Sequence, residues 1–237
     1  MSVIVEARSL AIKGRLRPTS FRLEGGKLTC LVGPNGSGKT SLLHAIAGVG
    51  SPDGSVTVDG TDPRGVHPDK RQRLLAFLPA SRDIIWPLSG RDLIALGLPA
   101  GTDHEVVTTI CEDLELGDLA SRRMDRLSTG ERSRILIART LAPEPKLLLL
   151  DEPTANLDPL WQLKLLDKLR QRASSTGEAI LIAIHDLDMA KRYGDRIIVM
   201  KNGCIEADGS TSDIFSGPAI AAAFGIEWKH GRWEPLA

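Results

Sequence analysis

The sequence predicts an α/β fold with a mostly parallel sheet, and two observations support this class. Short apolar runs without polar alternation recur along the chain, which is typical of parallel strands covered on both faces. One of them, residues 28–32, leads into a glycine-rich turn that is followed by apolar residues at helical spacing. With 237 residues, the chain is long enough for one large α/β domain with an inserted lobe.

The strands are expected at seven apolar runs. They are residues 3–6, 28–32, 56–58, 74–78, 147–150, 180–183 and 197–200. The runs at 147–150 and 180–183 contain only apolar residues and are expected at the centre of the sheet, and the N-terminal β segment is expected to be antiparallel.

The middle of the chain has the pattern of helices. Ser89 precedes apolar residues at helical spacing, and Thr102 with Glu105 matches a capping box. Ser210 with Asp213 is a further cap candidate, at the start of a tail expected to pack on the core. We therefore expect one domain over 1–237, with a core at 1–81 and 141–210, a helical subdomain at 82–140 and a C-terminal extension at 211–237.

Composition limits the class of partner and the location. The 30 basic residues balance the 30 acidic ones, and no basic stripe indicates nucleic acid. No apolar run approaches the roughly 20 residues that span a bilayer, and the N-terminus lacks a signal-peptide core, so a cytoplasmic chain is expected. Cys30, Cys111 and Cys204 are isolated and are expected to be reduced and mostly buried.

The glycine-rich turn fits a phosphate-binding motif. Residues 33–40, GPNGSGKT, match G-x-x-x-x-G-K-[ST] between a strand and a helix, a context that an ordinary glycine turn does not require. Lys39 is expected to reach the β- and γ-phosphates, and the Thr40 hydroxyl to bind Mg²⁺. The motif predicts a P-loop NTPase core, with further nucleotide contacts from Gly33, Pro34, Asn35, Gly36, Ser37, Gly38 and Ser41.

Two acids follow the apolar run at 147–150. Asp151 is placed to hold Mg²⁺ through water opposite Thr40, and Glu152 to accept a proton from the attacking water. Two acids that simply cap a strand edge are the alternative. The phosphate-binding motif favours the catalytic interpretation.

A second motif, LSTGE at residues 127–131, has two interpretations. Ser128 and Glu131 form a capping box. The same helix N-terminus offers N–H groups and a positive dipole to an anion, such as the γ-phosphate of a second nucleotide. The residues alone leave both interpretations open.

The order of these motifs resembles the nucleotide-binding subunit of an ATP-binding-cassette (ABC) transporter. GPNGSGKTS, LSTGE, LLLLDEPTANLD and the AIHD of residues 183–186 follow one another as in that family, over about residues 1–225. LSTGE stands at the family's signature, residues 155–158 match its D-loop, and His185 matches its switch histidine. A lone histidine is more often structural, but this position favours the switch role.

The resemblance implies a homodimer that binds ATP and Mg²⁺ head to tail. His185 is then catalytic and senses the γ-phosphate. Each ATP is expected to lie between Lys39, Thr40, Asp151 and Glu152 of one copy and Ser128, Gly130 and Glu131 of the other. ATP is expected to close the dimer and hydrolysis to open it.

The resemblance also implies partners at a membrane. Two transmembrane permease subunits, and indirectly an extracytoplasmic substrate-binding protein, place the chain on the cytoplasmic face of the cell membrane. Residues 75–79, 85–97 and 223–228 are similar to importers of iron–siderophore, haem or cobalamin type. General packing of the helical lobe is the alternative explanation of these segments, and import itself is implied only by the resemblance.

Two positions depart from the family pattern. Ala80 stands where the family usually has a glutamine that contacts Mg²⁺ or the attacking water. Either Ser81 or a water replaces that amide, or hydrolysis and coupling are altered. Gln72 is too far upstream to replace it. Residues 10–17 lack the aromatic side chain that usually stacks on adenine, which leaves Ile12 or Arg15 to cover the base. We expect weaker discrimination between bases.

Two other functions remain as alternatives. A non-transport ABC ATPase, in DNA repair or translation, is disfavoured by the neutral charge and by the lack of coiled-coil, zinc or second-cassette segments. A nucleotide-sensing module with impaired hydrolysis is motivated by Ala80. Glu152 and His185 speak against it, because a site without turnover needs no base.

Overall fold

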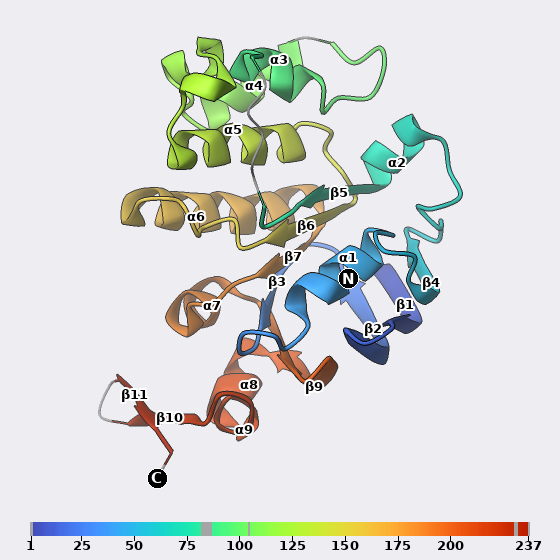
Figure 1. Cartoon of the computed structure of the whole chain (residues 1–237), viewed down its shortest axis with the longest axis vertical. Coiled ribbons are helices and arrows are strands. Elements are labelled where there is room, and N and C mark those ends of the chain that lie inside the picture. Colours follow the sequence, from blue (N-terminus) through green and yellow to red (C-terminus); the bar gives the residue numbers. More distant parts are fainter. Residues whose placement is uncertain (1, 82–86, 104, 230–231, 237) are drawn as a thin grey trace.

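A six-stranded sheet lies at the centre of the protein (Figure 1), in the order β5-β6-β7-β3-β8-β9. The computed structural model describes residues 2–81, 87–103, 105–229 and 232–236. All neighbouring strands are parallel except β8 and β9. The strands are β3 (Lys27–Val32), β5 (Leu75–Leu78), β6 (Leu147–Asp151), β7 (Ala179–Ala183), β8 (Arg196–Lys201) and β9 (Cys204–Ser210). The predicted mostly parallel α/β class is confirmed.

The two strands predicted for the centre are buried along their whole length. Every residue of β6 and β7 is buried, which explains why their sequences do not alternate. The predicted run at 74–78 is shorter in the structure, because Leu74 ends helix α2 (Pro68–Leu74) and β5 begins at Leu75. The sequence did not predict β9.

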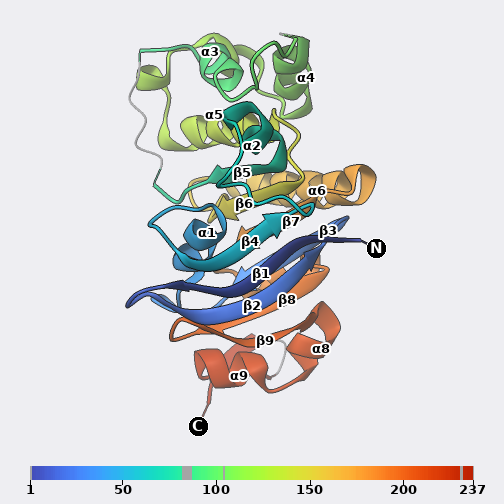
Figure 2. The ribbon, with the colours of Figure 1, turned by 90° about the vertical axis from the view of Figure 1, so that its right-hand side faces the viewer.

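The N-terminal segment is antiparallel, as predicted. Strands β1 (Val3–Ile12), β2 (Leu16–Glu24) and β4 (Asp53–Val58) form a separate sheet in the order β2-β1-β4. Figure 2 shows these strands side by side across the middle of the molecule. Their apolar side chains join those of α1 (Lys39–Ile46) in a core against the central sheet. The sequence did not predict β2.

The elements described between residues 87 and 140 are helices and helical turns. They are α3 (Gly90–Ala95), α4 (Glu105–Asp113), the 3₁₀ turns Gly117–Ser121 and Met124–Arg126, and α5 (Thr129–Leu141), which lie together at the top of Figure 1. Ser89 caps α3 by accepting a bond from the Asp92 N–H (3.1 Å). The predicted cap at Thr102 is wrong: its hydroxyl donates to the Pro99 carbonyl, and Asp103 accepts from the Glu105 N–H. The domain boundaries stay a prediction.

The C-terminal residues pack back on the core, as expected. Ser210 caps α8 (Thr211–Ser216) by accepting a bond from the Asp213 N–H, and Ile220 and Ala223 of α9 (Ala219–Phe224) are buried. A hairpin of β10 (Ile226–Lys229) and β11 (Arg232–Pro235) follows, which the sequence did not predict. These elements share the larger core with α6 (Pro159–Thr176) and α7 (Leu187–Tyr193).

Two further expectations concern the cysteines and membrane-spanning segments in the part of the chain that is described. Cys30 and Cys111 are buried, Cys204 is half-buried, and all three are free thiols, as expected. Burial raises the pKa of the Cys30 thiol to about 12. Among the described helices, none combines the length and the apolar character needed to cross a bilayer.

A buried ion pair joins α6 to the start of β7. The Arg172 guanidinium donates to both carboxylate oxygens of Glu178 at 2.7 Å, and Glu178 is 5% exposed. We expect Glu178→Gln to lower the free energy of unfolding by about 2 kcal/mol, because it leaves a largely buried guanidinium without its counter-charge. Urea denaturation measures this loss.

Glu115→Gln is the matched control, because Glu115 pairs with Lys164 at the surface. Its loss should stay below about 0.5 kcal/mol. Equal losses in the two variants would contradict the importance given to burial.

Candidate functional site

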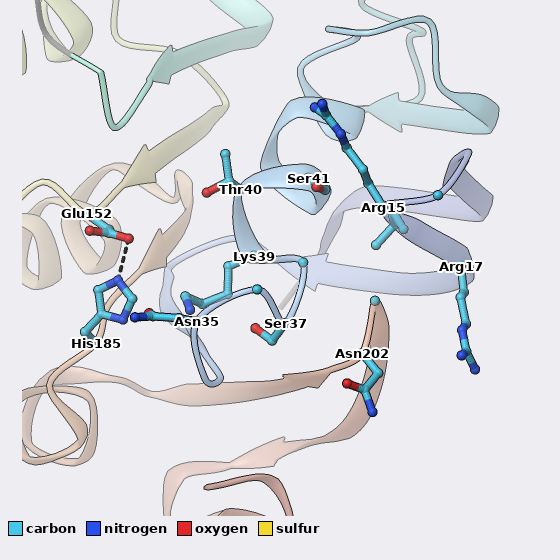
Figure 3. A pocket seen from close by; sticks show the side chains of 15 residues that line it. Arg15, Arg17, Asn35, Ser37, Lys39, Thr40, Ser41, Glu152, His185 and Asn202 are labelled. Carbon is cyan, nitrogen blue, oxygen red and sulfur yellow. Dashed lines mark hydrogen bonds and ion pairs between the residues drawn. The ribbon is translucent and has the colours of Figure 1, made fainter.

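One pocket collects residues from the carboxyl ends of three neighbouring parallel strands. The phosphate-binding motif follows β3, Glu152 follows β6, and His185 follows β7, so the strand order brings them to one edge of the sheet. The pocket has a volume of about 590 Å³ and is lined by residues 14–17, 35–41, Glu152, His185, Asn202 and Gly203. Figure 3 shows the motif between Glu152 and His185 on one side and Arg15 and Arg17 on the other.

Lys39 places a positive charge at the floor of this pocket. Its ammonium donates to the carbonyl oxygens of Gly33 (2.7 Å) and Pro34 (3.2 Å), and the residue is only 6% exposed. Burial lowers the pKa of Lys39, and the carboxylates of Glu152 and Asp151 oppose this shift. The Lys39 ammonium therefore lies where the sequence predicted the phosphates. Gly33 and Pro34 do not line the pocket, and their carbonyls accept from this ammonium.

Two glycines of the motif are required by the local backbone. A Cβ on Gly33 would lie 2.4 Å from the Met200 carbonyl oxygen and 2.6 Å from the Ser37 hydroxyl. Gly38 has a φ of +104° at the N-cap of α1, a conformation that side chains disfavour. The motif can therefore pass close to β8 and enter α1 with the N-terminus of that helix at the pocket.

Asp151 lies beside Thr40 and interacts with the Lys39 charge. Asp151 is fully buried at the end of β6. Burial raises the pKa of its carboxyl, and the hydrogen bond from the Thr40 hydroxyl partly offsets this shift. A buried carboxylate beside a hydroxyl oxygen, at the edge of an open pocket, is an oxygen donor set of the kind that Mg²⁺ prefers.

Glu152 and His185 contact each other across the pocket edge. His185 Nε2 pairs with Glu152 Oε1, as the dashed line in Figure 3 shows. Glu152 has a left-handed backbone (φ +50°), which costs a non-glycine residue about 1 kcal/mol. The Glu152 N–H donates to the Ala183 carbonyl of β7 (3.1 Å), so the end of β6 is fixed to the strand that leads to His185. The two side chains are placed for proton acceptance and for orienting a reactant.

The LSTGE residues lie outside this pocket. Ser128 Oγ accepts from the Glu131 N–H (3.3 Å), Glu131 Oε2 accepts from the Ser128 N–H (2.7 Å), and Arg122 donates to Glu131 Oε1 (2.9 Å). The capping-box interpretation is thus confirmed. A Cβ on Gly130 would lie 2.7 Å from the Asn156 carbonyl oxygen, so this turn packs closely on the backbone of Asn156.

Arginines and a turn form the far end of the pocket. Of the two residues proposed to cover the nucleotide base, Arg15 lines the pocket. Ile12 packs instead on the core of the antiparallel sheet. Arg17 and Asn202 also line it, and sequence analysis missed both. The Asn202-Gly203 pair, with φ of +50° and +76°, is a hairpin-turn signal that could have located β9 and this edge.

Ala80, which stands at the position of the family glutamine, lies beyond the end of β5 and is exposed. Neither Ala80 nor Ser81 belongs to the described residues that line the pocket. Gln72 lies on α2, upstream of β5, as expected for a residue that does not replace the missing amide.

Comparisons with known proteins agree with this geometry. The family model for "ABC transporter" matches residues 16–155. The chain is 34% identical over 240 residues to the vitamin B12 import ATP-binding protein of Vibrio atlanticus, covering 95% of each chain. It is 38% identical over 218 residues to the hemin import ATP-binding protein of Pseudomonas entomophila, covering 87% of this chain and 85% of that protein.

Further matches include longer proteins and a solved structure. Cobalamin import ATP-binding proteins of two Halobacterium salinarum strains are 35% identical over 210 residues, and the chain spans about half (53%) of their length. A solved ATP-binding subunit of an ABC transporter superposes with a TM-score of 0.80 at 25% identity, covering 90% of this chain and 92% of that one. The chain therefore belongs to the ABC transporter family and carries its ATP-binding domain.

Proposed function

We propose that this chain is the ATP-binding and ATP-hydrolysing subunit of an ABC importer. The observation that carries the proposal is the meeting of the phosphate-binding motif, Asp151, Glu152 and His185 at one sheet edge. The names of the relatives support import as the direction, since they are import ATP-binding proteins.

In this proposal the protein acts by positioning and charge. The Lys39 ammonium and the N–H groups of residues 36–40 bind the phosphates and neutralise the charge that develops on them. Glu152 accepts a proton from the attacking water, and His185 holds the Glu152 carboxylate and contacts the γ-phosphate. Thr40 and Asp151 would hold Mg²⁺, which supplies charge stabilisation to the phosphate oxygens when bound.

The position of LSTGE supports a head-to-tail homodimer. Ser128, Gly130 and Glu131 lie at the N-terminus of α5, away from the pocket of their own copy. A second copy would bring this helix end, with its N–H groups and positive dipole, to the nucleotide. Because the Glu131 carboxylate is engaged in the cap and with Arg122, we propose that it acts by holding Ser128 in place.

The cargo and the membrane partners are finer proposals. Relatives are named for cobalamin, hemin, molybdate or tungstate, and sulfate, so their names agree on import and not on one substrate. We propose an iron chelate, haem or cobalamin, on the similarity of residues 75–79, 87–97 and 223–228 to such importers; Ile85 and Trp86 lie outside the described residues. Two permease subunits, and indirectly an extracytoplasmic binding protein, would complete the assembly at the cytoplasmic face.

Ala80 favours a second candidate function, a nucleotide switch without turnover. The non-transport alternative finds no support among the relatives' names. Measurement of Mg²⁺-dependent ATP turnover separates the importer ATPase from the switch.

The first prediction concerns the proton acceptor. Glu152→Gln should lower kcat for ATP by at least about a hundredfold, because the amide cannot accept the proton of water. ATP affinity should change little, since Lys39 and the N–H groups are untouched. Steady-state turnover and nucleotide titration of the purified chain measure both quantities.

Ala80→Gln is the paired variant. A rise in turnover above the natural chain would show that the missing amide limits the rate. ATP binding without turnover above the Glu152→Gln level would contradict an autonomous ATPase and favour the switch or a requirement for the membrane subunits.

A second prediction uses the buried carboxylate. Because burial raises the pKa of Asp151, the stability linked to its protonated form is lost as the pH rises through that pKa. Asp151→Asn should therefore raise the free energy of unfolding of the nucleotide-free chain at pH 7 by about 1 kcal/mol. It should also abolish the Mg²⁺-dependent part of the thermal stabilisation by ATP.

Asp62→Asn is the control of opposite sign. The Arg64 guanidinium lowers the pKa of Asp62, so its charged form stabilises the fold above the ordinary carboxyl pKa. This variant should gain no stability and should keep the Mg²⁺ effect. A stabilised Asp62→Asn, or an unchanged Asp151→Asn, would contradict the assignment.

A third prediction concerns the base. A guanidinium stacks on any purine, so ATP and GTP should bind within about threefold of each other. Arg15→Ala should weaken both by about fivefold, because it removes that ring-face contact. Fluorescence titration with both nucleotides measures this. Lys13→Ala, at an exposed cation of the same turn outside the pocket lining, is the control. Strong adenine selectivity in the natural chain would contradict stacking of the base on Arg15.

A further inference from the structure

Three aromatic rings gather over the exposed face of α7, and we name Phe215, Trp228 and Trp233 the aromatic clamp. Trp228 and Trp233 lie opposite each other on the β10–β11 hairpin, with ring centroids 5.0 Å apart and an interplanar angle of 72°. Phe215 of α8 lies 6.2 Å from Trp233. Phe215 and Trp233 also pack against the larger core, so the clamp is anchored from below. Figure 1 shows the hairpin beyond α8 and α9, at the carboxyl end of the chain.

Two charged residues of α7, Asp188 and Lys191, contact this clamp. Trp233 Nε1–H donates to Asp188 Oδ1 at 3.2 Å. The Lys191 ammonium lies 5.0 Å from the ring centroid of Trp228 and 5.7 Å from that of Phe215. Asp188 and Lys191 are three residues apart and so share one face of the helix. A carboxylate at an indole N–H and an ammonium over ring faces are the arrangements that aromatic electrostatics favour.

Asp188 joins the clamp to the loop that carries His185. Asp186 is the N-cap of α7, and its Oδ1 accepts from the N–H groups of Asp188 (2.8 Å) and Met189 (2.9 Å). The backbone of Asp188 thus holds the cap directly after His185, while its side chain holds Trp233. The two contacts therefore meet at one residue of α7.

Helix α7 needs such support because it is short. It has seven residues, of which only Leu187, Ala190 and Tyr193 are buried. Helices of this length are not stable alone and depend on their tertiary contacts. The first residue of α8, Thr211, donates its hydroxyl to the Gly194 carbonyl at the other end of α7. The C-terminal elements therefore contact α7 at both ends.

We propose that the aromatic clamp positions His185, with Trp233 and Asp188 as the positioning residues. The clamp fixes α7, and the Asp186 cap transmits that fixed position to the imidazole paired with Glu152. This inference rests on the proposed ATPase function for its effect on turnover. It concerns the placement of His185 alone, which can be measured without turnover.

The experiment uses the full-length chain and compares matched variants. Trp233→Phe keeps an aromatic ring and removes the N–H donor. Asp188→Ala removes the acceptor, and Asp188→Asn keeps an oxygen that can accept. Arg232→Gln is the control, because Arg232 neighbours Trp233 on β11, has a side chain that is 77% exposed and pairs with Glu234 of the same strand.

The direct readout is the NMR signal of the His185 imidazole in the nucleotide-free chain. It is assigned among the five histidines by its loss in His185→Gln. We expect Trp233→Phe and Asp188→Ala to shift this signal, and Asp188→Asn and Arg232→Gln to leave it unchanged. In turnover assays, kcat should fall about threefold in the first two variants, the loss expected for one hydrogen bond near the surface, with KM for ATP unchanged. The double variant should lose no more than either single one.

Each result decides one of the two proposals. An unmoved His185 signal in Trp233→Phe overturns the positioning role. Equal shifts in Arg232→Gln also overturn it, because the hairpin would then act only through general stability. A shifted signal in a chain that binds ATP without any turnover supports the clamp and contradicts the proposed ATPase function.

Discussion

The buried ammonium of Lys39 is the charge around which the pocket is arranged. Its hydrogen bonds to the Gly33 and Pro34 carbonyls require the backbone to fold back at the end of β3, close to β8. That approach is possible only because residue 33 has no side chain to meet the Met200 carbonyl. Across the pocket, the carboxylates of Asp151 and Glu152 support the protonated form. The site thus holds a partly compensated cation, which an anionic phosphate would neutralise further.

The sequence predicted which residues meet at this edge of the sheet because its signals are local. Strands β3, β6 and β7 have continuous apolar runs, and each site residue follows its strand directly, so parallel pairing was enough to bring Lys39, Glu152 and His185 together. Strand β9 was not predicted because its residues are half-exposed or exposed along its length and it has no apolar run. The sequence therefore did not predict Asn202 as a pocket residue, because its place beside the phosphate-binding motif depends on the antiparallel return of β9.

Helix caps also show which local sequence patterns predict structure and which do not. Ser128 and Glu131 satisfy each other's backbone N–H groups, and the box is complete from residues three positions apart. At Thr102 the same pattern failed, because the Pro99 carbonyl takes the hydroxyl and the stronger acceptor, Asp103, takes the Glu105 N–H. A cap pattern predicts a helix start only where no nearer acceptor competes for the same groups. The Trp233–Asp188 contact joins residues 45 positions apart, which no local pattern encodes.

The pair of Glu152 and His185 is fixed from two directions that differ in physical character. On the sheet side, Ala183 accepts from the Glu152 N–H, and the next residue, Ile184, donates to the Leu31 carbonyl of β3. These bonds offset the cost of the left-handed conformation at Glu152 and make the position of its carboxylate a property of the sheet. On the helix side, His185 depends on the cap of a short helix whose exposed face is held by side chains alone. The carboxylate is therefore placed by backbone bonds of the sheet alone, whereas the imidazole also depends on the cap of α7, so changes in position within the pair should arise on the α7 side.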